Sequence, residues 1–180
     1  MLFDKDYSFR GSHAEKVREL TSQFTSTGKA RLFSSNINIY VLAPLIGFLY
    51  RRKACLDKSS NETNKIFFSE IARRSDDLQY NYRLIMLLDE KNELSFEGRL
   101  NKAFRYYGNE CKETLADEQL YEDYVLGGVD VLYEKLIQDA LKPEDYLKNL
   151  YDFVEEFEER YNSDVPIEDI ADMYKRNSYF

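Results

Sequence analysis

The side chains that most often do chemistry are scarce in this sequence. It has one histidine, His13, and two cysteines, Cys55 and Cys111. Helical di-iron sites need paired Glu-x-x-His motifs, and the common zinc sites need several His or Cys ligands, so neither can be built here. The chain also lacks the GxxxxGK and GxGxxG phosphate loops and the GxSxG elbow. The sequence therefore predicts no catalytic residue, no metal site and no cofactor.

Two weaker arrangements could still carry chemistry. The carboxylates of the run from Glu155 to Glu159 could hold Mg²⁺ or Ca²⁺. They flank Phe157 on a predicted helix, however, and we interpret them as a solvated acidic face. His13 could approach Cys55 or Cys111 only through the fold. An enzyme with an unrecognised site near His13 is therefore the lowest-ranked hypothesis.

A small anion site is one interpretation of the segment that precedes the first predicted helix. Ser12 and Glu15 have the spacing of a capping box, so a helix is expected to begin at Ser12. Free amides at that helix start, together with Arg10, Ser12 and His13, could bind an anion. In this position His13 is expected to be a neutral imidazole at the surface. The alternative is an ordinary helix cap without a ligand.

Clustered cations in the first part of the chain could bind nucleic acid. Arg51, Arg52 and Lys53 follow the most apolar segment, and Arg73 and Arg74 end the next short helix. If those helices are antiparallel neighbours, the two clusters join, with Arg83 and Arg105 nearby and tyrosines available for base stacking. The alternative is that cations at helix C-termini only complement the helix dipole.

Charge is distributed unevenly along the chain. The net charge is −8, with an excess of +4 in residues 1–110 and −12 in residues 111–180. This asymmetry is compatible with an acidic partner for the first part, although solvated acidic helix faces in the second part explain it equally. Hydrophobic residues make up 43% of the chain and charged residues 32%, a globular balance. Together with the length of 180 residues, this predicts one domain, 1–180.

Helical periodicity predicts the fold class. The predicted helices run from Ser12 towards Gly28, from Ile66 to Arg74, from Asp76 to Leu88, from Ser95 to Gly108, from Asp117 to Asp139 with a glycine pair at 127–128, and from Pro143 and Pro166 onward. The glycine pair indicates a kink, a break or a close helix crossing. No pair of strands is predicted. We therefore expect an all-α, compact domain of about seven or eight helices around the apolar helix Ile39–Tyr50.

The apolar stretch Leu32–Tyr50 has two possible structures, and we do not expect it to span a membrane. It could be one helix kinked at Pro44, which we prefer, or a short strand Ile37–Leu42 followed by a helix. Its strongly apolar part is too short for a membrane span. With no secretory signal pattern and no disulfide framework, a cytoplasmic location is expected.

The spacing of apolar residues also predicts which side chains form the core. Those expected to point inward are Leu20, Phe24, Val41, Leu42, Leu45, Leu49, Ile85, Leu88, Leu100, Phe104, Leu132, Leu136, Leu150 and Val154. The many Tyr rings are expected at the edge of the core, with their hydroxyls in water.

The leading functional hypothesis is a non-catalytic helical interaction subunit that acts in a larger assembly or as a homo-oligomer. It depends on the scarcity of catalytic side chains and on the number of Tyr and Phe residues available for a protein partner. The alternative is a nucleic-acid-associated subunit that binds through a basic face of residues 1–110. A membrane partner is not expected.

Overall fold

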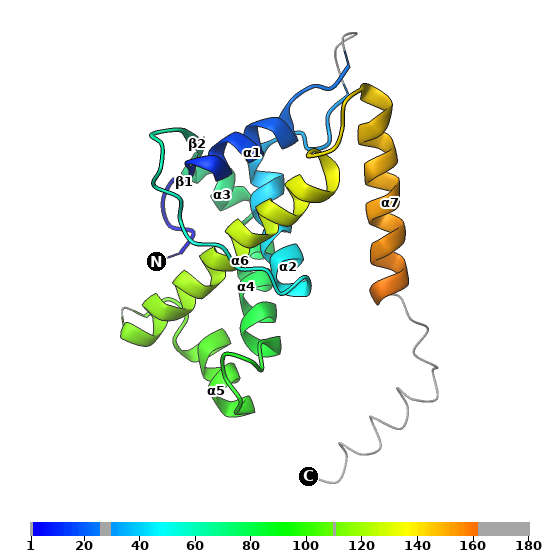
Figure 1. Cartoon of the computed structure of the whole chain (residues 1–180). Helices are drawn as coiled ribbons and strands as arrows, with labels where there is room; N and C mark the ends of the chain where they lie inside the picture. Colours follow the sequence, from blue (N-terminus) through cyan, green and yellow to red (C-terminus); the bar gives the residue numbers. More distant parts are fainter. Residues whose placement is uncertain (1, 26–29, 110, 162–180) are drawn as a thin grey trace.

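The computed structural model describes residues 2–25, 30–109 and 111–161, and this part of the chain is mostly helical (Figure 1). The all-α class is thereby confirmed at the level of helix content. The elements are β1 (Tyr7–Arg10), α1 (Ser12–Thr21), α2 (Asn36–Leu49), β2 (Thr63–Ile66), α3 (Phe68–Arg73), α4 (Ser75–Leu88), α5 (Phe96–Leu100), the π-helix η1 (Asn101–Arg105), α6 (Lys112–Leu136) and α7 (Pro143–Tyr161). The predicted stop at Gly28 and the helix after Pro166 lie outside the described residues.

The prediction that no strands pair is wrong in one place. β1 and β2 form a two-stranded antiparallel sheet in which Tyr7 is opposite Ile66 and Arg10 is opposite Thr63. Each strand has four residues, too few to show an alternating pattern clearly. Part of the polar segment 58–65 therefore forms a strand, and the sheet connects the N-terminus to the start of α3.

The apolar segment folds as one helix, so the strand Ile37–Leu42 does not form. α2 continues through Pro44, which lacks the N–H that would bond to the preceding turn. In that turn the carbonyl of Val41 accepts a hydrogen bond of 2.8 Å from the side chain of Asn81 on α4. This bond joins α2 to α4 three residues before the proline. None of the described helices is long and apolar enough to cross a membrane.

Glycines allow α2 and α6 to cross almost backbone to backbone. A Cβ atom on Gly128 would lie 1.8 Å from the carbonyl oxygen of Ala43, and one on Gly47 would lie 2.1 Å from that of Tyr124. Gly127 contacts the backbone of Arg52 in the same way. The glycine pair therefore marks a close helix crossing, and α6 runs through it as one uninterrupted helix. Figure 1 shows α6 lying across α2.

The C-terminus of α2 ends in a left-handed residue that is not glycine. Arg51 has φ 55°, and the amide of Arg52 bonds at 2.8 Å to the carbonyl of Gly47, as in a helix-terminating Schellman motif. A side chain in this conformation is strained by roughly 1 kcal/mol.

The variant Arg51→Gly should therefore be more stable than the wild type by up to about 1 kcal/mol. Urea unfolding measures this difference. The control is Arg51→Ala, which removes the same charge but keeps Cβ and so should give no comparable gain. Equal stabilisation by both variants would show that the gain comes from removing the charge of Arg51 and not from relieving backbone strain.

The core consists of the inner faces of the helices together with Phe9 and Ile66 from the two strands, and it differs from the predicted set. Leu20, Ile85, Leu132 and Leu136 are buried as expected. The positions predicted inward but only partly buried are Phe24, Val41, Leu42, Leu45 and Leu49. Those predicted inward but exposed are Leu88, Leu100, Phe104, Leu150 and Val154.

Most of the described tyrosines are partly buried or exposed, as predicted, but the prediction is wrong for several rings. Tyr40, Tyr82 and Tyr121 are buried in the interior instead of at its edge. Burial raises the pKa of each of these phenols above the usual value. The interior therefore contains a tyrosine cluster in which the rings of Tyr82 and Tyr121 have centroids 5.6 Å apart.

Candidate interaction surface

The structure does not bring the two predicted basic clusters together. Lys53, beyond the end of α2, donates to Asn92 beyond the end of α4, whereas Arg74, before the start of α4, donates to Asn38 in the first turn of α2. α2 and α4 therefore run in the same direction. The clusters lie at opposite ends of a helix of 14 residues, about 20 Å long at 1.5 Å per residue. The single face needed for one polyanion surface is absent from the described residues.

Several of the predicted nucleic-acid-binding residues already have partners within the chain. Arg52 pairs with Glu134 at 2.7 Å, and Arg74 pairs with Asp77 at 2.6 Å. The guanidinium of Arg83 lies between the rings of Phe104 and Tyr107, at 5.5 and 5.6 Å from their centroids. Arg73 and Arg105 are exposed to solvent.

Arg51 and Lys53 are the predicted residues that do meet at one site. With Lys91, they line a hollow of about 440 Å³ between the C-terminal ends of α2 and α4. The ammonium of Lys53 lies 5.0 Å from the centre of the Tyr124 ring, whose hydroxyl donates to the buried Asp89 at 2.6 Å. The carboxylates of Asp89 and Glu90 line the same hollow, so its charge is mixed.

The predicted anion site is filled by a carboxylate of the chain itself. Asp57 accepts a hydrogen bond of 2.8 Å from the amide of Ser12 at the start of α1. Hydrogen bonds from the Ser12 amide and from Ser59 hold the pKa of Asp57 well below its usual range. Gly11, with φ 57°, lets Asp57 approach, since a Cβ there would lie 2.7 Å from the carboxylate. The Ser12 side chain makes no cap, so the predicted capping box is wrong.

His13 is buried, not at the surface. It is 4% exposed, and its Nε2 atom lies 3.2 Å from Oδ1 of Asp130 on α6. Lys16 donates to the same oxygen at 2.7 Å. Burial alone would raise the pKa of Asp130, but the contacts with His13 and Lys16 outweigh it and lower the pKa. His13 thus joins α1 to α6, while Arg10 is exposed and takes no part. The two cysteines are both free.

Exposed apolar side chains form the most distinctive surface features. One group belongs to the hairpin made by α4 and α5–η1, and we define its hairpin face as Leu88, Leu94, Phe96, Leu100 and Phe104. A second group lies on the last described helix, and we define the α7 outer face as Leu147, Leu150, Tyr151 and Val154. Sequence periodicity missed both, because it cannot distinguish a core stripe from an equally apolar stripe that remains open.

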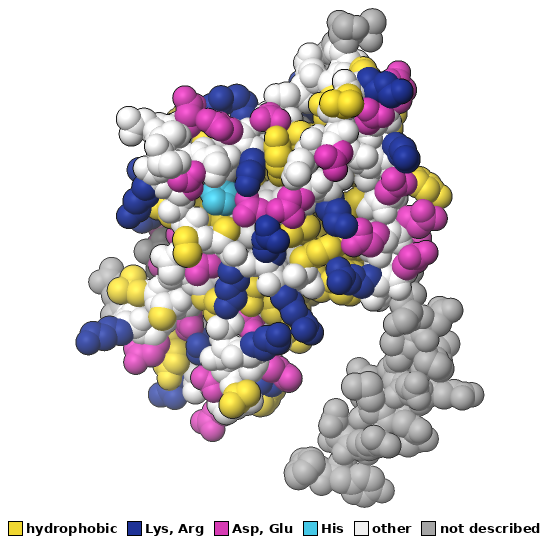
Figure 2. Space-filling view, in the orientation of Figure 1, with side chains coloured by type: hydrophobic (Ala, Val, Ile, Leu, Met, Phe, Trp, Pro, Cys, Tyr) yellow, Lys and Arg dark blue, Asp and Glu magenta, His cyan; other side chains and the backbone are white. Residues whose placement is uncertain are grey.

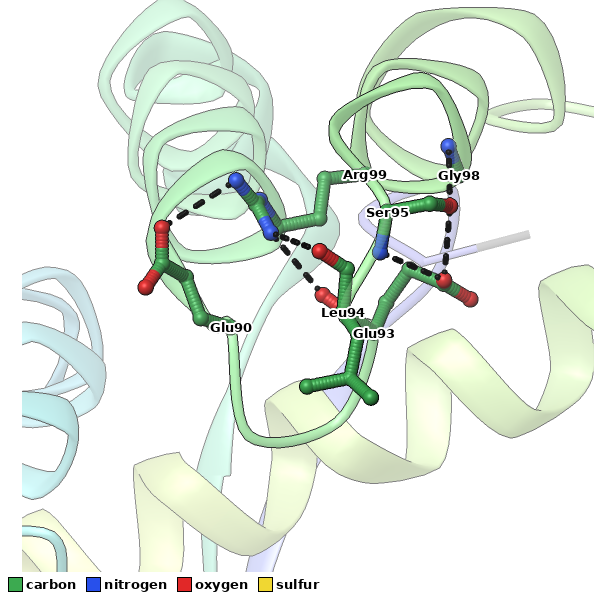
Figure 3. A network of polar contacts seen from close by, with 6 residues as sticks. All are labelled: Glu90, Glu93, Leu94, Ser95, Gly98 and Arg99. Carbon is green, nitrogen blue, oxygen red and sulfur yellow. Dashed lines mark hydrogen bonds and ion pairs between the residues drawn. The ribbon is translucent and has the colours of Figure 1, made fainter.

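The loop at the tip of the hairpin is held in place by Arg99 (Figure 3). This guanidinium, almost wholly buried, donates at 3.0 Å to the carbonyls of Glu93 and Leu94 and at 3.2 Å to Glu90. Ser95 caps α5 by accepting from the Gly98 amide at 3.1 Å, as the sequence predicts. The network fixes the loop backbone while the side chain of Leu94 stays 88% exposed.

Replacing Arg99 with Leu should loosen this loop. The substitution leaves two carbonyls and a carboxylate without their donor, at a cost of about 1 to 3 kcal/mol. Amides of residues 90–95 should exchange hydrogen at least about tenfold faster, measured by mass spectrometry. The control is Arg105→Leu, which removes an exposed arginine from the same hairpin and should leave those amides unchanged. Unchanged exchange in Arg99→Leu would contradict the assigned role.

Metal chemistry finds no support in the described part of the chain, which contains no group of three or more His, Cys, Asp or Glu placed to hold an ion. The chain matches no protein-family model, and no curated protein or solved structure is significantly similar to it. Its function therefore has to be inferred from its own surfaces.

Proposed function

We propose that this protein is a non-catalytic interaction subunit that binds a protein partner, or another copy of itself, through exposed apolar helix faces. One observation carries the proposal. Leu88, Leu100, Phe104, Leu150 and Val154 have the sequence spacing of core residues, yet they are exposed in the folded chain.

Single exposed apolar residues need no explanation, but grouped ones mark interaction sites. The hairpin face supports the proposal in a second way. The loop that presents Leu94 is already held in place by Arg99, so binding a partner does not require this loop to become ordered. A preorganised contact costs less conformational entropy on binding than a mobile one. The π-helix η1, which contains Phe104, is a rare element of a kind often found at functional sites.

The test is site-specific photo-crosslinking in native cells, combined with light scattering of the purified protein. Crosslinkers placed at Leu94 and Leu150 should capture a discrete partner or a second copy. One placed at the exposed Glu15 on α1 should capture neither. Leu100→Asp and Val154→Asp, introduced in turn, should abolish capture at their own face while circular dichroism stays unchanged. A monomeric mass with equal, diffuse crosslinking at all three positions would refute the proposal.

Nucleic acid remains a second candidate partner, supported by the hollow that Arg51, Lys53 and Lys91 line. The partly buried Tyr161 also borders it and could stack on an unpaired base. A mobility-shift assay with single-stranded RNA and DNA at low salt tests this candidate. Binding should weaken steeply with salt and disappear in Lys53→Glu/Lys91→Glu. Absence of a shift at low salt would reject it.

A further inference from the structure

α7 uses only part of its apolar surface to contact the rest of the protein. On the inner side, the Tyr146 ring stacks on Phe24 at 4.9 Å, Phe153 is buried, and the Tyr161 hydroxyl donates to the carbonyl of Leu49 at 2.8 Å. Figure 1 shows α7 at the edge of the molecule, with the other described elements along one side of it only.

The α7 outer face has the pattern of a helix-binding stripe. Its residues, at positions i, i+3, i+4 and i+7, fall on one side of the helix. Leu147 is 60% exposed, Tyr151 65% and Val154 51%, while Leu150 lies between them and the inner side. This is the spacing with which amphipathic helices bind one another.

The border of this stripe is strongly acidic. α7 carries seven acidic and two basic side chains. Glu156 is neutralised by Lys135 at 2.6 Å, and Asp145 accepts from the amides of Leu141 and Lys142. The other five carboxylates make no ion pair with any described residue, namely Glu144, Asp152, Glu155, Glu158 and Glu159. In Figure 2, acidic side chains gather along the region of α7.

Helical geometry places these unpaired carboxylates next to the stripe. At 100° per residue, Glu158 falls within the outer face, and Glu144 and Glu155 fall on the flank that faces away from Phe153. A second copy of α7 would bring two such borders together, and like-charge contacts of this kind oppose binding. A helix with a basic border would instead meet opposite charge along its whole length.

We infer that the α7 outer face binds a basic amphipathic helix of a partner protein, with aliphatic anchors against Leu147, Leu150, Tyr151 and Val154 and Lys or Arg beside the acidic border. This inference rests on the proposed function and names the class of partner for one of its two faces. Apolar contact supplies the affinity, and charge selects the partner and accelerates its association.

The experiment compares three synthetic peptides on the full-length chain by fluorescence anisotropy. One has a leucine stripe with lysine borders, the second has the same stripe with glutamate borders, and the third is a scrambled version of the lysine peptide. The first should bind at least about 30-fold more tightly than the other two, and its affinity should fall with added salt. Leu150→Asp/Val154→Asp and Glu155→Lys/Glu159→Lys should each weaken it at least about tenfold. Leu100→Asp on the hairpin face is the matched control and should not change it.

Each alternative occupant gives a different result. Equal binding of the lysine and scrambled peptides would show that charge alone causes the binding and would overturn the inference. Preference for the glutamate peptide, or self-association that Val154→Asp abolishes, would also overturn it, although the proposed interaction function would stand. Failure of crosslinking at both faces, by contrast, would remove the proposed function itself.

Discussion

Gly128→Ala should destabilise the fold by about 3 kcal/mol or more, although glycine-to-alanine changes normally stabilise a helix by roughly 1 kcal/mol. The reversed sign follows from the helix crossing. The added Cβ would meet the carbonyl oxygen of Ala43 at 1.8 Å and its carbonyl carbon at 2.5 Å. Both are backbone atoms, so no side-chain rotation can relieve the overlap. α2 and α6 would have to separate along their most extensive contact.

Urea unfolding followed by far-ultraviolet circular dichroism measures this effect. Gly98→Ala is the matched control, since the atoms nearest to a Cβ there belong to the side chains of Glu93, at 2.5 Å, and Ser95, at 2.6 Å, and side chains can rotate away where a backbone carbonyl cannot. That variant should stay within about 1 kcal/mol of the wild type. Loss below 1 kcal/mol in Gly128→Ala would show that the helices can part cheaply and that the close crossing is not required for stability.

Features of this fold that depend on residues close together in the sequence could be predicted, and those that depend on residues far apart could not. The helix starts at Ser95 and Pro143 follow from residues within one turn, and both agree with the structure. The β1–β2 pair depends on residues more than fifty positions apart, and its four-residue strands have no pattern of their own. Asp57 likewise replaces the predicted cap of α1 from 45 positions away.

The exposure of the candidate surfaces also depends on residues far apart in the sequence. Helical spacing correctly identifies Leu88, Leu100, Leu150 and Val154 as apolar stripe positions. Whether a stripe is covered depends on which other helices reach it, and that is decided by the crossing of α2 and α6 and by the hairpin of α4 with α5–η1. That the two basic clusters lie apart could not be predicted for the same reason, since the directions of α2 and α4 cannot be read from either helix alone.

Asp130→Asn should lower the free energy of unfolding at neutral pH by about 2 to 3 kcal/mol, because it removes the charge that faces His13 and Lys16. Asn keeps the shape of the side chain, so little packing is lost. Contacts with His13 and Lys16 lower the pKa of Asp130 in the folded protein, although burial opposes them. The ionised carboxylate therefore stabilises the fold above its ordinary pKa of 3.8.

The lowered pKa of Asp130 determines how the difference in unfolding free energy between wild type and Asp130→Asn depends on pH. The difference in unfolding free energy should shrink as the pH falls through 3.8 and vanish below the lowered pKa of the folded state. Asp117→Asn is the control with the opposite sign. Asp117 pairs with Lys102 at 3.0 Å, but burial outweighs that pair and raises its pKa. Ionised Asp117 therefore costs stability at neutral pH, and its amide variant should be at least as stable as the wild type there.

Urea unfolding across this pH range measures both variants. Parallel pH profiles for the two would mean that the loss in Asp130→Asn arises from packing, and that the contact of α1 with α6 does not depend on the charge of Asp130.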